Sequence, residues 1–292
     1  MITETRGLSV AAVLAAALIW SSSFAVTKVA LTEVPPMTLG ALRFVLAALV
    51  LGVAARRFPR PSPRQRRSMG LAGLLGITAY FALENAGVDL ATASDATLIV
   101  AAYPIITLAL SGRTAFSPVR LVGMLVALTG VWLVVREQTG GGHRLWGDVL
   151  LIAGGVAWAV YNIVVRRDSS GASPIVVTYY QTLAGAGGFV VLSLTETSRW
   201  SVPSGGTVLR IGFLAVFCSV AAFLLYNHGL RGLEPSVAVN LLNVVPVAGL
   251  GWAVVLAGER LSWWQLAGGA VVLTGVFLGS LRRPPKTVGV PR

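Results

Sequence analysis

The stretch "TLGALRFVLAALVLG" (residues 38–52) is apolar over its whole length except for one arginine, Arg43. It lies inside an apolar run, residues 36–55, that has the length of about 20 residues needed to cross the hydrocarbon of a bilayer. An arginine inside a membrane helix costs about 2.5–3.5 kcal/mol on insertion scales, so it normally faces a partner or a watery cavity. The stretch therefore predicts a membrane span whose arginine has a structural or functional role.

The composition of the whole chain agrees with a membrane protein. Of its 292 residues, 55% are hydrophobic and 12% are charged, and the mean hydropathy is +0.78. Soluble domains carry about 25% charged residues. The net charge of +12 would suggest nucleic acid in a soluble chain, but here the basic residues lie between apolar runs and set topology. We expect the lipid bilayer as a partner and no nucleic acid.

Ten apolar runs have the length of a membrane span, which predicts an all-α integral membrane protein. They cover roughly residues 8–31, 36–55, 68–87, 91–111, 118–136, 147–166, 174–195, 207–229, 235–257 and 264–281. With a cytoplasmic N-terminus, 16 of the 23 Lys and Arg residues fall on the cytoplasmic side and 6 on the other side. The positive-inside rule therefore predicts a multi-pass protein of the plasma (inner) membrane with both termini in the cytoplasm.

Two basic segments then lie in the cytoplasm. One is the loop "RRFPRPSPRQRR" (56–67), whose three prolines argue against helix. The other is the tail, residues 282–292.

The residues needed for several kinds of chemistry are missing. Cys218 is the only cysteine, so the chain can form neither an intrachain disulfide nor a thiol cluster for a metal. Neither His143 nor His228 has a partner at the spacing of a helical zinc site, and the chain has no phosphate-binding G-x-x-x-x-G-K-[ST] motif. We expect no metal, no cofactor and no enzymatic activity.

The chain also repeats itself. "LIWSSSFAVTK" (18–28) matches "VAWAVYNIVVR" (156–166), and the same offset of 138 pairs Arg43 with Gln181. "YFALENAG" (80–87) matches "AFLLYNHG" (222–229), an offset that also pairs Pro104 with Pro246, and "GMLVALTGVWL" (123–133) matches residues 268–278. Three blocks in the same order predict two related halves, residues 8–136 and 147–281.

Each half holds five predicted spans, an odd number, so the second half enters the membrane from the opposite side. This predicts ten transmembrane helices arranged as two inverted five-helix repeats. That construction is common in secondary transporters, whose substrate site lies near the midplane where the halves meet. A repeat kept only for packing is the alternative.

The same residues resemble a known family. "LIWSSSFAVTK", "ALRFVLAAL", "ATLIVAAYPIITLAL" and especially "GERLSWWQLAGGAVVLTGVFLG" are similar to the EamA-like transporters of the drug/metabolite transporter superfamily, over residues 8–281. The resemblance implies a ten-helix bundle that moves small metabolites, often outward, without ATP hydrolysis. The family's Gly-Glu-Arg motif stands at Gly258-Glu259-Arg260, but the first half reads "SGRTAFSP", so we interpret Glu259 and Arg260 as a local cap or loop pair.

Four charges are expected at similar depth in the first half: Lys28, Arg43, Glu84 and Asp95. Two interpretations stay open, because charges within a membrane pair with one another or face a cavity. In the first, Arg43 and Glu84 form a structural pair that locks two spans together. In the second, Arg43 binds an anionic group of the substrate, while Glu84 or Asp95 takes up protons.

A second set of residues combines aromatic rings with amides and hydroxyls at membrane depth, which suits a mostly apolar metabolite with polar ends. The candidates for substrate binding, besides Arg43, are Trp20, Ser21, Phe24, Tyr80, Asn85, Tyr103, Trp158, Tyr161, Asn162, Tyr226, Asn227, Asn240 and Asn243. Pro104 and Pro246 interrupt their spans at matching places, which predicts hinges or static kinks.

The sequence thus predicts a secondary active transporter, an exporter of a small amphipathic metabolite such as an amino acid. It would work by alternating access, with proton exchange as one way of driving it. A homodimer stays among the possible partners. The alternatives are a channel or a structural membrane protein and, with less support, a membrane-embedded lipid-modifying enzyme.

Overall fold

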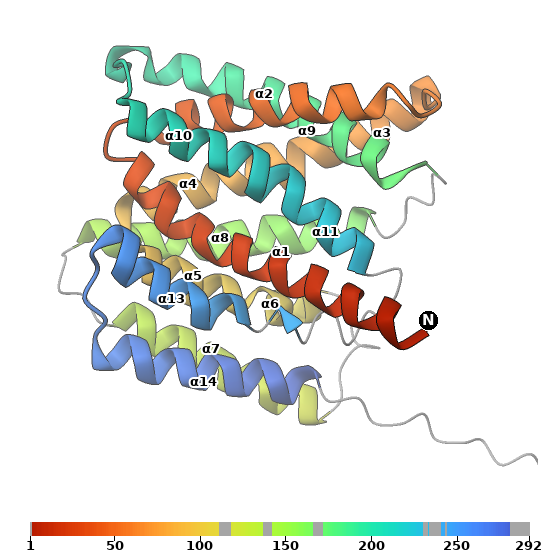
Figure 1. The fold of residues 1–292 in the computed structure, drawn as a ribbon. Coiled ribbons are helices and arrows are strands. Elements are labelled where there is room, and N and C mark those ends of the chain that lie inside the picture. Colours follow the sequence, from red (N-terminus) through yellow and green to blue (C-terminus); the bar gives the residue numbers. More distant parts are fainter. Residues whose placement is uncertain are drawn as a thin grey trace, which may run out of the picture.

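The computed structural model describes residues 2–110, 118–136, 142–165, 172–229, 233, 241–242 and 244–280. Every regular element in these ranges is a helix, and the helices lie side by side in one bundle (Figure 1). Six are long and apolar enough to span a membrane: Gly7–Ala30, Pro36–Ala55, Pro63–Leu90, Gly142–Asn162, Pro174–Arg199 and Gly205–Tyr226. Four shorter apolar helices accompany them: Ala93–Thr107, Leu121–Arg136, Val244–Ala257 and Trp263–Leu278. The chain is a multi-pass membrane protein.

The first half begins with α1 (Ile2–Ala30) and α2 (Pro36–Ala55). Three consecutive segments then form one continuous helical rod: α3 (Pro63–Gly73), the π-helix η1 (Leu74–Ala79) and α4 (Tyr80–Leu90). It is followed by α5 (Ala93–Ala101), α6 (Tyr103–Leu110) and α7 (Pro118–Arg136).

The described residues of the second half show a similar order of helices. It contains α8 (Gly142–Val165) and α9 (Pro174–Ser193), which continues as the 3₁₀-helix η3 (Leu194–Arg199). A second composite rod joins α10 (Gly205–Phe213), the π-helix η4 (Leu214–Ala221) and α11 (Ala222–Gly229). Within the described residues, α13 (Val244–Ala257) and α14 (Trp263–Ser280) complete the bundle.

The basic segment 56–67 differs from its expectation, because helix α3 already begins at Pro63. Proline is tolerated at the first position of a helix, where its missing N–H would have no partner in any case. The Ser62 side chain accepts a hydrogen bond from the Gln65 N–H at 3.3 Å, and the Gln65 side chain accepts one from the Ser62 N–H at 2.8 Å. This reciprocal capping box starts the helix inside the predicted loop.

Equivalent helices of the two halves pack as antiparallel pairs. In α7 and α14, a Cβ atom added at Gly130 would lie 2.5 Å from the backbone nitrogen of Val272 and 2.7 Å from the carbonyl oxygen of Gly268. Gly275, later in α14, meets the earlier Ala127 of α7. A residue late in one helix therefore contacts a residue early in the other, and the glycines let the two backbones touch.

The pair formed by α2 and α9 has the same sense. Gly40, early in α2, lies against the ring of Phe189, late in α9, whereas Gly52 lies against Tyr179. Figure 1 shows both pairs, α2 with α9 along one edge of the bundle and α7 with α14 along the other. Antiparallel packing of equivalent helices is what two oppositely inserted halves would produce.

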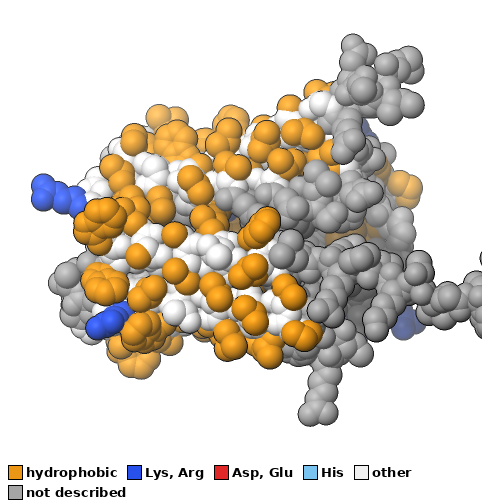
Figure 2. Space-filling view, turned by 90° about the horizontal axis from the view of Figure 1, so that it is seen from below, with side chains coloured by type: hydrophobic (Ala, Val, Ile, Leu, Met, Phe, Trp, Pro, Cys, Tyr) orange, Lys and Arg blue, Asp and Glu red, His pale blue; other side chains and the backbone are white. Residues whose placement is uncertain are grey.

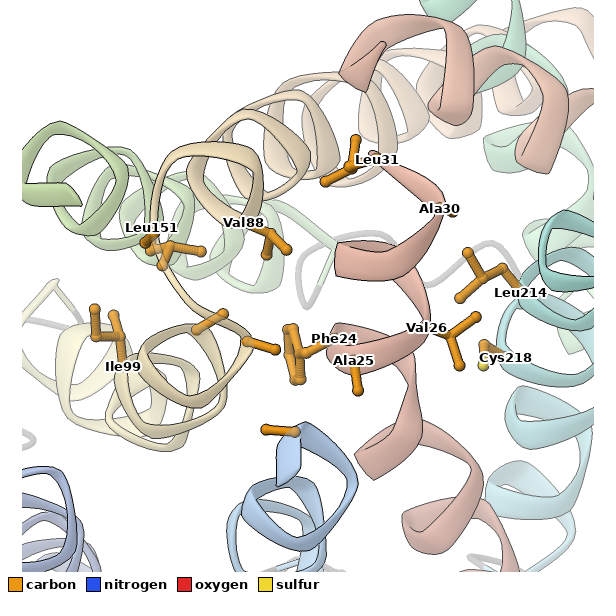
Figure 3. Packing of buried hydrophobic residues seen from close by; sticks show 14 of the residues in the cluster. Phe24, Ala25, Val26, Ala30, Leu31, Val88, Ile99, Leu151, Leu214 and Cys218 are labelled. Atoms are coloured by element: carbon orange, nitrogen blue, oxygen red, sulfur yellow. The ribbon is translucent and has the colours of Figure 1, made fainter. Parts of the chain in front are cut away.

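Helix α1 runs through the middle of the bundle. Its Phe24, Ala25 and Val26 are buried between Val88 of α4 on one side and Leu214 of η4 on the other (Figure 3). The core of the molecule therefore lies between the halves, along α1.

The outer surface is apolar where α7 and α14 face outward. Trp132, Leu125, Trp263 and Phe277 are between 56% and 83% exposed. Hydrophobic side chains cover this face, and the Lys and Arg side chains visible on it lie near its edges (Figure 2). A face of this composition is suited to contact lipid rather than water.

Replacing Gly130 by leucine should force α7 and α14 apart, because its side chain would enter the backbone of α14. Overpacking of this kind costs about 1–3 kcal/mol. We expect a lower temperature for the loss of monodisperse protein in detergent. The matched control is Gly251→Leu in α13, where an added Cβ meets no atom within 4 Å; equal melting of the two variants would contradict the close pairing.

Candidate functional site

Arg43 of α2 lies in the interior of the bundle and is only 4% exposed. Its Nε donates a hydrogen bond of 2.9 Å to the hydroxyl of Ser219 in η4. The guanidinium carbon lies 5.0 Å from the ring centre of Phe44 and 4.8 Å from that of Phe81, within the range of cation–π attraction. Arg43 thus joins the first half of the chain to the second half.

Glu84 of α4 accepts a short hydrogen bond from the Tyr80 hydroxyl one turn before it, and its side chain is buried. The described residues show no ion pair between Arg43 and Glu84, so the structural pair considered above is not formed. None of the described residues accepts a hydrogen bond from the two terminal guanidinium nitrogens of Arg43 either. The interior therefore holds a cation with donors to spare and a nearby carboxyl group.

A line of aromatic rings starts at this cation. The Tyr80 ring centre lies 4.5 Å from Phe81, 5.0 Å from Trp158 and 6.1 Å from Tyr103, and Trp158 lies 5.2 Å from Tyr161. The rings come from α4, α6 and α8, and they bring together four of the predicted site residues: Tyr80, Tyr103, Trp158 and Tyr161. Such a wall can hold an apolar or aromatic group.

Two π-helices flank the same region. Segments η1 and η4 end at Ala79 and Ala221, which are equivalent positions in the repeat alignment. In η4 the Ser219 hydroxyl donates to the carbonyl of Leu214 at 3.0 Å, and the carbonyl of Cys218 accepts from Trp20 Nε1 at 3.0 Å. π-Helices are rare and occur frequently at functional sites.

Trp20 extends the aromatic lining on the other side of α1. Its ring centre lies 5.2 Å from Phe223 and 5.5 Å from Tyr226, both in α11. Trp20 and Tyr226, predicted separately from the two halves, thus lie together.

Other predicted site residues satisfy the protein's own backbone. Tyr103 donates from its hydroxyl to the Leu151 carbonyl at 2.7 Å, and Asn85 donates to the Pro36 carbonyl at 3.0 Å. Asn162 bonds to the Trp158 carbonyl of its own helix, at 2.9 Å. These contacts hold helices together or satisfy a side chain locally.

Ser21 and Phe24 also lie at packed positions. Ser21 donates to the Leu18 carbonyl and accepts from Trp252 Nε1, and Phe24 is part of the apolar core around α1. Asn240 and Asn243 fall outside the described residues, as does the side chain of Asn227.

One of the two prolines, Pro104, lies next to an interruption of its span within the described residues. Helix α5 ends at Ala101, and α6 begins at Tyr103, directly before Pro104. Pro246 is the third residue of α13. The break before Pro104 agrees with the predicted interruption, and movement about either proline stays a prediction.

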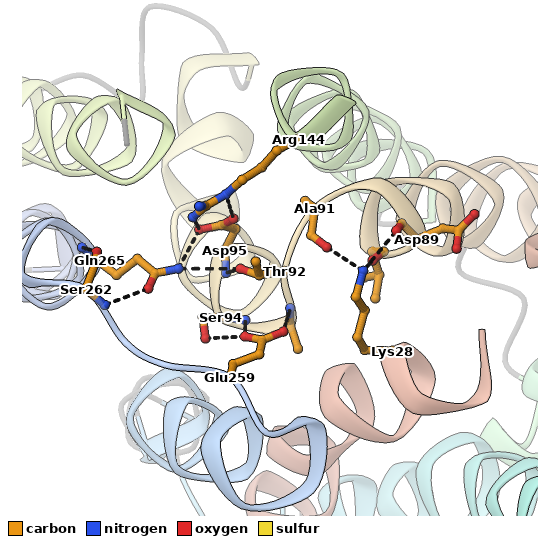
Figure 4. Close-up of polar contacts among 12 residues, drawn as sticks. Lys28, Asp89, Ala91, Thr92, Ser94, Asp95, Arg144, Glu259, Ser262 and Gln265 are labelled. Atoms are coloured by element: carbon orange, nitrogen blue, oxygen red, sulfur yellow. Dashed lines mark hydrogen bonds and ion pairs between the residues drawn. The ribbon is translucent and has the colours of Figure 1, made fainter. Parts of the chain in front are cut away.

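The other predicted charges lie at the end of the bundle opposite the N-terminus, which we call the Lys28 end. There Lys28 donates to the carbonyls of Val88, Asp89 and Ala91 at 2.6–2.9 Å (Figure 4). A cation at the C-terminus of a helix satisfies its last carbonyl groups and complements the helix dipole. Lys28 is therefore a cap for α4.

Asp95 of α5 joins three helices at this end. Its carboxylate accepts two hydrogen bonds from Arg144 of α8, at 2.7 and 2.9 Å, and a third from Gln265 of α14 at 2.9 Å (Figure 4). We call these three residues the Asp95 clasp. Lys28 and Asp95 thus belong to the Lys28 end, whereas Arg43 and Glu84 lie deeper.

Three glutamates at the same end cap the N-termini of helices in the opposite half. Glu196 accepts from the backbone of Met37 and Thr38 at the start of α2, and Glu259 accepts from Ala93 and Ser94 at the start of α5. Carboxylates are stabilised at helix N-termini, where backbone N–H groups lack partners. These caps tie the halves together.

Glu33 caps α10 from the loop that follows α1. The backbone N–H of Ser204 donates to it at 2.7 Å and the Ser204 hydroxyl at 2.8 Å, and these bonds lower the pKa of Glu33 below its usual value. It is the counterpart, from the first half, of the two glutamates above.

The turn at the Gly-Glu-Arg motif determines the position of the Glu259 side chain. Gly258 has a φ of 68°, a conformation that favours glycine, and the Glu259 N–H returns to the Ala253 carbonyl at 3.1 Å. The left-handed conformation of Gly258 ends α13 and turns the chain towards α5. The expectation of a local cap is corrected to a long-range one, because Glu259 caps a helix of the other half.

Sequence analysis did not identify several residues of the interior site. Phe81, Ser219 and the Cys218 carbonyl contact Arg43 or Trp20 directly. Serine and cysteine in an apolar run carry no signal of their own, and a π-helix leaves no periodic pattern in the sequence. An apolar groove of about 540 Å³, lined mainly by Leu18, Val26, Phe213 and Trp252, opens between α1, α10 and α13.

Removing the Glu259 carboxylate should loosen the start of α5. We expect Glu259→Ala to destabilise the protein by about 0.5–2 kcal/mol, the usual effect of losing an N-terminal cap. Hydrogen exchange should become faster at the amides of Ala93 and Ser94. Arg260→Ala removes the exposed neighbouring side chain and serves as the control; exchange that is unchanged in Glu259→Ala would show that the cap contributes nothing.

Comparison with known proteins identifies the family to which the chain is similar. The sequence profile of the EamA-like transporter family matches the chain twice, over residues 7–136 and 145–281. An uncharacterized transporter of Archaeoglobus fulgidus is 25% identical, over 91% of this chain and 95% of its own. The inner membrane transporter YedA of Escherichia coli K12 is 26% identical, over 94% and 92%.

Two further matches are a named efflux pump and a solved structure. A protein of Salmonella typhimurium named "Probable amino-acid metabolite efflux pump" is 26% identical, over 89% of this chain and 91% of its own. A solved crystal structure superposes with a TM-score of 0.64 over 92% of this chain and 95% of the other, at 22% identity. That similarity supports the fold alone.

Proposed function

This chain belongs to the EamA-like transporter family, and we propose that it is a secondary active transporter that exports a small amphipathic metabolite, such as an amino acid. In this proposal it lies in the plasma (inner) membrane with both termini in the cytoplasm. Residues 8–136 and 147–281 form two inverted repeats that enclose the substrate site and expose it alternately to either side. The antiparallel packing of α2 with α9 and of α7 with α14 supports this arrangement.

The observation that carries the proposal is the state of Arg43. Its guanidinium is buried, touches both halves and keeps hydrogen-bond donors that no described residue uses. A planar guanidinium is well matched to a carboxylate, which it can bind through two parallel hydrogen bonds. We assign Arg43 to the carboxylate end of the substrate.

The rings next to Arg43 fit the rest of such a molecule. Phe81 lies 4.8 Å from the guanidinium carbon, and Tyr80 contacts both Phe81 and Trp158, so the three rings offer apolar faces for a side chain. Their faces and the Glu84 carboxyl group are suited to the ammonium end. The efflux pump of Salmonella typhimurium, named for amino-acid metabolites, supports this substrate class.

Proton exchange is the proposed driving force. Buried acidic residues in membrane proteins commonly form proton relays. In the described part of the chain, Glu84 accepts a hydrogen bond from Tyr80 alone and lies beside the proposed substrate site, whereas the Asp95 carboxylate is held by both Arg144 and Gln265. Of these two candidates we favour Glu84.

The experiment that tests the transporter assignment is counterflow in vesicles that contain the purified protein. Vesicles are loaded with one unlabelled amino acid at a time, and entry of the same labelled amino acid is followed. Saturable, transient accumulation of at least one amino acid is expected from a carrier. Entry that never exceeds equilibrium for any amino acid would contradict the proposal and favour a channel or a structural protein.

Replacing Arg43 by lysine keeps the charge but removes the planar pair of donors. A hydrogen bond to a charged group contributes about 1.5–3 kcal/mol, so we expect a loss of roughly 10- to 100-fold in apparent affinity during counterflow. Arg56→Lys, at the exposed end of the same helix, is the control. Equal affinity of the two variants would exclude Arg43 from substrate binding.

Glu84→Gln separates coupling from binding. We expect this variant to lose accumulation driven by a pH gradient and to keep counterflow, because glutamine preserves the size of the side chain but exchanges no proton. The measurement compares both activities in the same vesicles. Proton-driven accumulation at the wild-type rate would remove Glu84 from the coupling mechanism.

A further inference from the structure

Asp148 is a second buried carboxyl group near the Asp95 clasp. Asp148 stands one turn after Arg144 on α8, and its side chain is 1% exposed. Neither carboxyl oxygen has a hydrogen-bond partner in the described part of the chain. Leaving a buried carboxylate without a partner is among the most costly arrangements in a protein, so a group with this geometry has to bind something.

The surroundings define what Asp148 can bind. Asp95 and Arg144 are the charged groups that act on it electrostatically. Arg144 is already engaged, since both of its hydrogen bonds to Asp95 are made by the same guanidinium. Two carboxyl groups thus share one arginine, and the second of them is left without its positive charge.

The helices packed around α8 bring no other cation to this place. Helix α4 contributes Glu84, bound to Tyr80, and Asp89, which interacts with Lys28; α6 and η1 carry no charged residue. The arginines of α3 lie at the opposite end of the bundle, near the start of that rod. On α8 itself, His143 is exposed.

A metal ion does not fit the same place. The described residues contain no group of three or more His, Cys, Asp or Glu side chains close enough to hold one. Hard cations need six or more oxygen ligands. A proton is the one cation that a single carboxyl group can bind alone.

We propose that Asp148 is a proton-binding site that controls the Asp95 clasp. With a proton on Asp148, Arg144 stays on Asp95 and ties α5, α8 and α14 together at the Lys28 end. When the proton leaves, Asp148 competes for Arg144 from one turn along the same helix, and the clasp weakens. The proton is exchanged with water, and no other bond is made or broken.

Only the biological purpose of this switch rests on the proposed function. In a transporter, the switch would couple opening of the Lys28 end to release of the proton. The site itself is tested without any substrate. Infrared spectra distinguish a protonated carboxyl group from a carboxylate, so the full-length protein in vesicles of phosphatidylethanolamine and phosphatidylglycerol is compared with its variants at neutral pH. A difference from the wild-type spectrum cancels the contribution of Glu84.

Asp148→Asn should lose one protonated-carboxyl band, and Asp148→Glu should keep one. Asp95→Asn should lose the same band although Asp148 is intact, because the freed Arg144 would then pair with Asp148. Glu196→Gln, which alters a helix-capping carboxylate at the same end, should leave the band unchanged. The Asp95→Asn result would not follow from a merely structural role of Asp148.

A wild-type band that persists in Asp148→Asn would overturn the proposal. A band that persists in Asp95→Asn would overturn the sharing of Arg144, even if Asp148→Asn failed to fold. Because no substrate is added, either result concerns Asp148 alone, whereas failure of counterflow with every amino acid concerns the transporter assignment.

Discussion

Hydrocarbon offers no hydrogen bonds, and this constraint governs the structure. Each polar group inside the bundle must find a partner in the protein or in enclosed water. Backbone groups meet the requirement by forming helices, and helix ends meet it through side chains: Lys28 caps the carbonyls of α4, and Glu259 caps the N–H groups of α5. Those caps come from distant parts of the chain, so satisfying the backbone also assembles the bundle.

Against this background the groups with spare hydrogen-bonding capacity stand out. Among the charged side chains that the structure describes, Arg43 keeps donors without a partner next to aromatic rings, and neither oxygen of Asp148 has a hydrogen-bond partner. The two lie in different surroundings, Arg43 against Ser219 of η4 and Asp148 one turn after Arg144 on α8. We interpret the first as the place for a substrate carboxylate and the second as the place for a proton, so binding and gating are assigned to separate residues.

The sequence predicted the helices well, because membrane spans are long, continuous apolar runs. The span 36–55 and the span 118–136 agree with α2 and α7 to the residue. The prediction that residues 56–67 form a loop was wrong at its end, where α3 begins. Three prolines suggested a loop, and the capping box of Ser62 and Gln65 was overlooked.

Individual contacts were harder to predict than spans. The structure brings together Trp20 and Tyr226, whose ring centres lie 5.5 Å apart, and Tyr80 and Trp158, whose ring centres lie 5.0 Å apart, and nothing in the sequence indicated either pairing. The supposed cluster of four charges is in fact two groups, because depth along a helix does not tell which neighbour a side chain faces. Ser219 was missed for a similar reason: its importance comes from a π-helix and from Arg43 opposite, neither of which its own residue type reveals.

The central claim is that the Arg43 guanidinium binds the carboxylate of the transported molecule between the two halves. It is tested most directly by competition: the amino acid that gives the strongest counterflow is challenged with unlabelled amino acid or with its carboxamide, which has the same shape without the negative charge. We predict that the carboxamide competes at least about 10-fold less well in the wild type, as expected for a lost charged hydrogen bond, and that Arg43→Gln abolishes this difference. Equal competition by both compounds in the wild type would contradict the account.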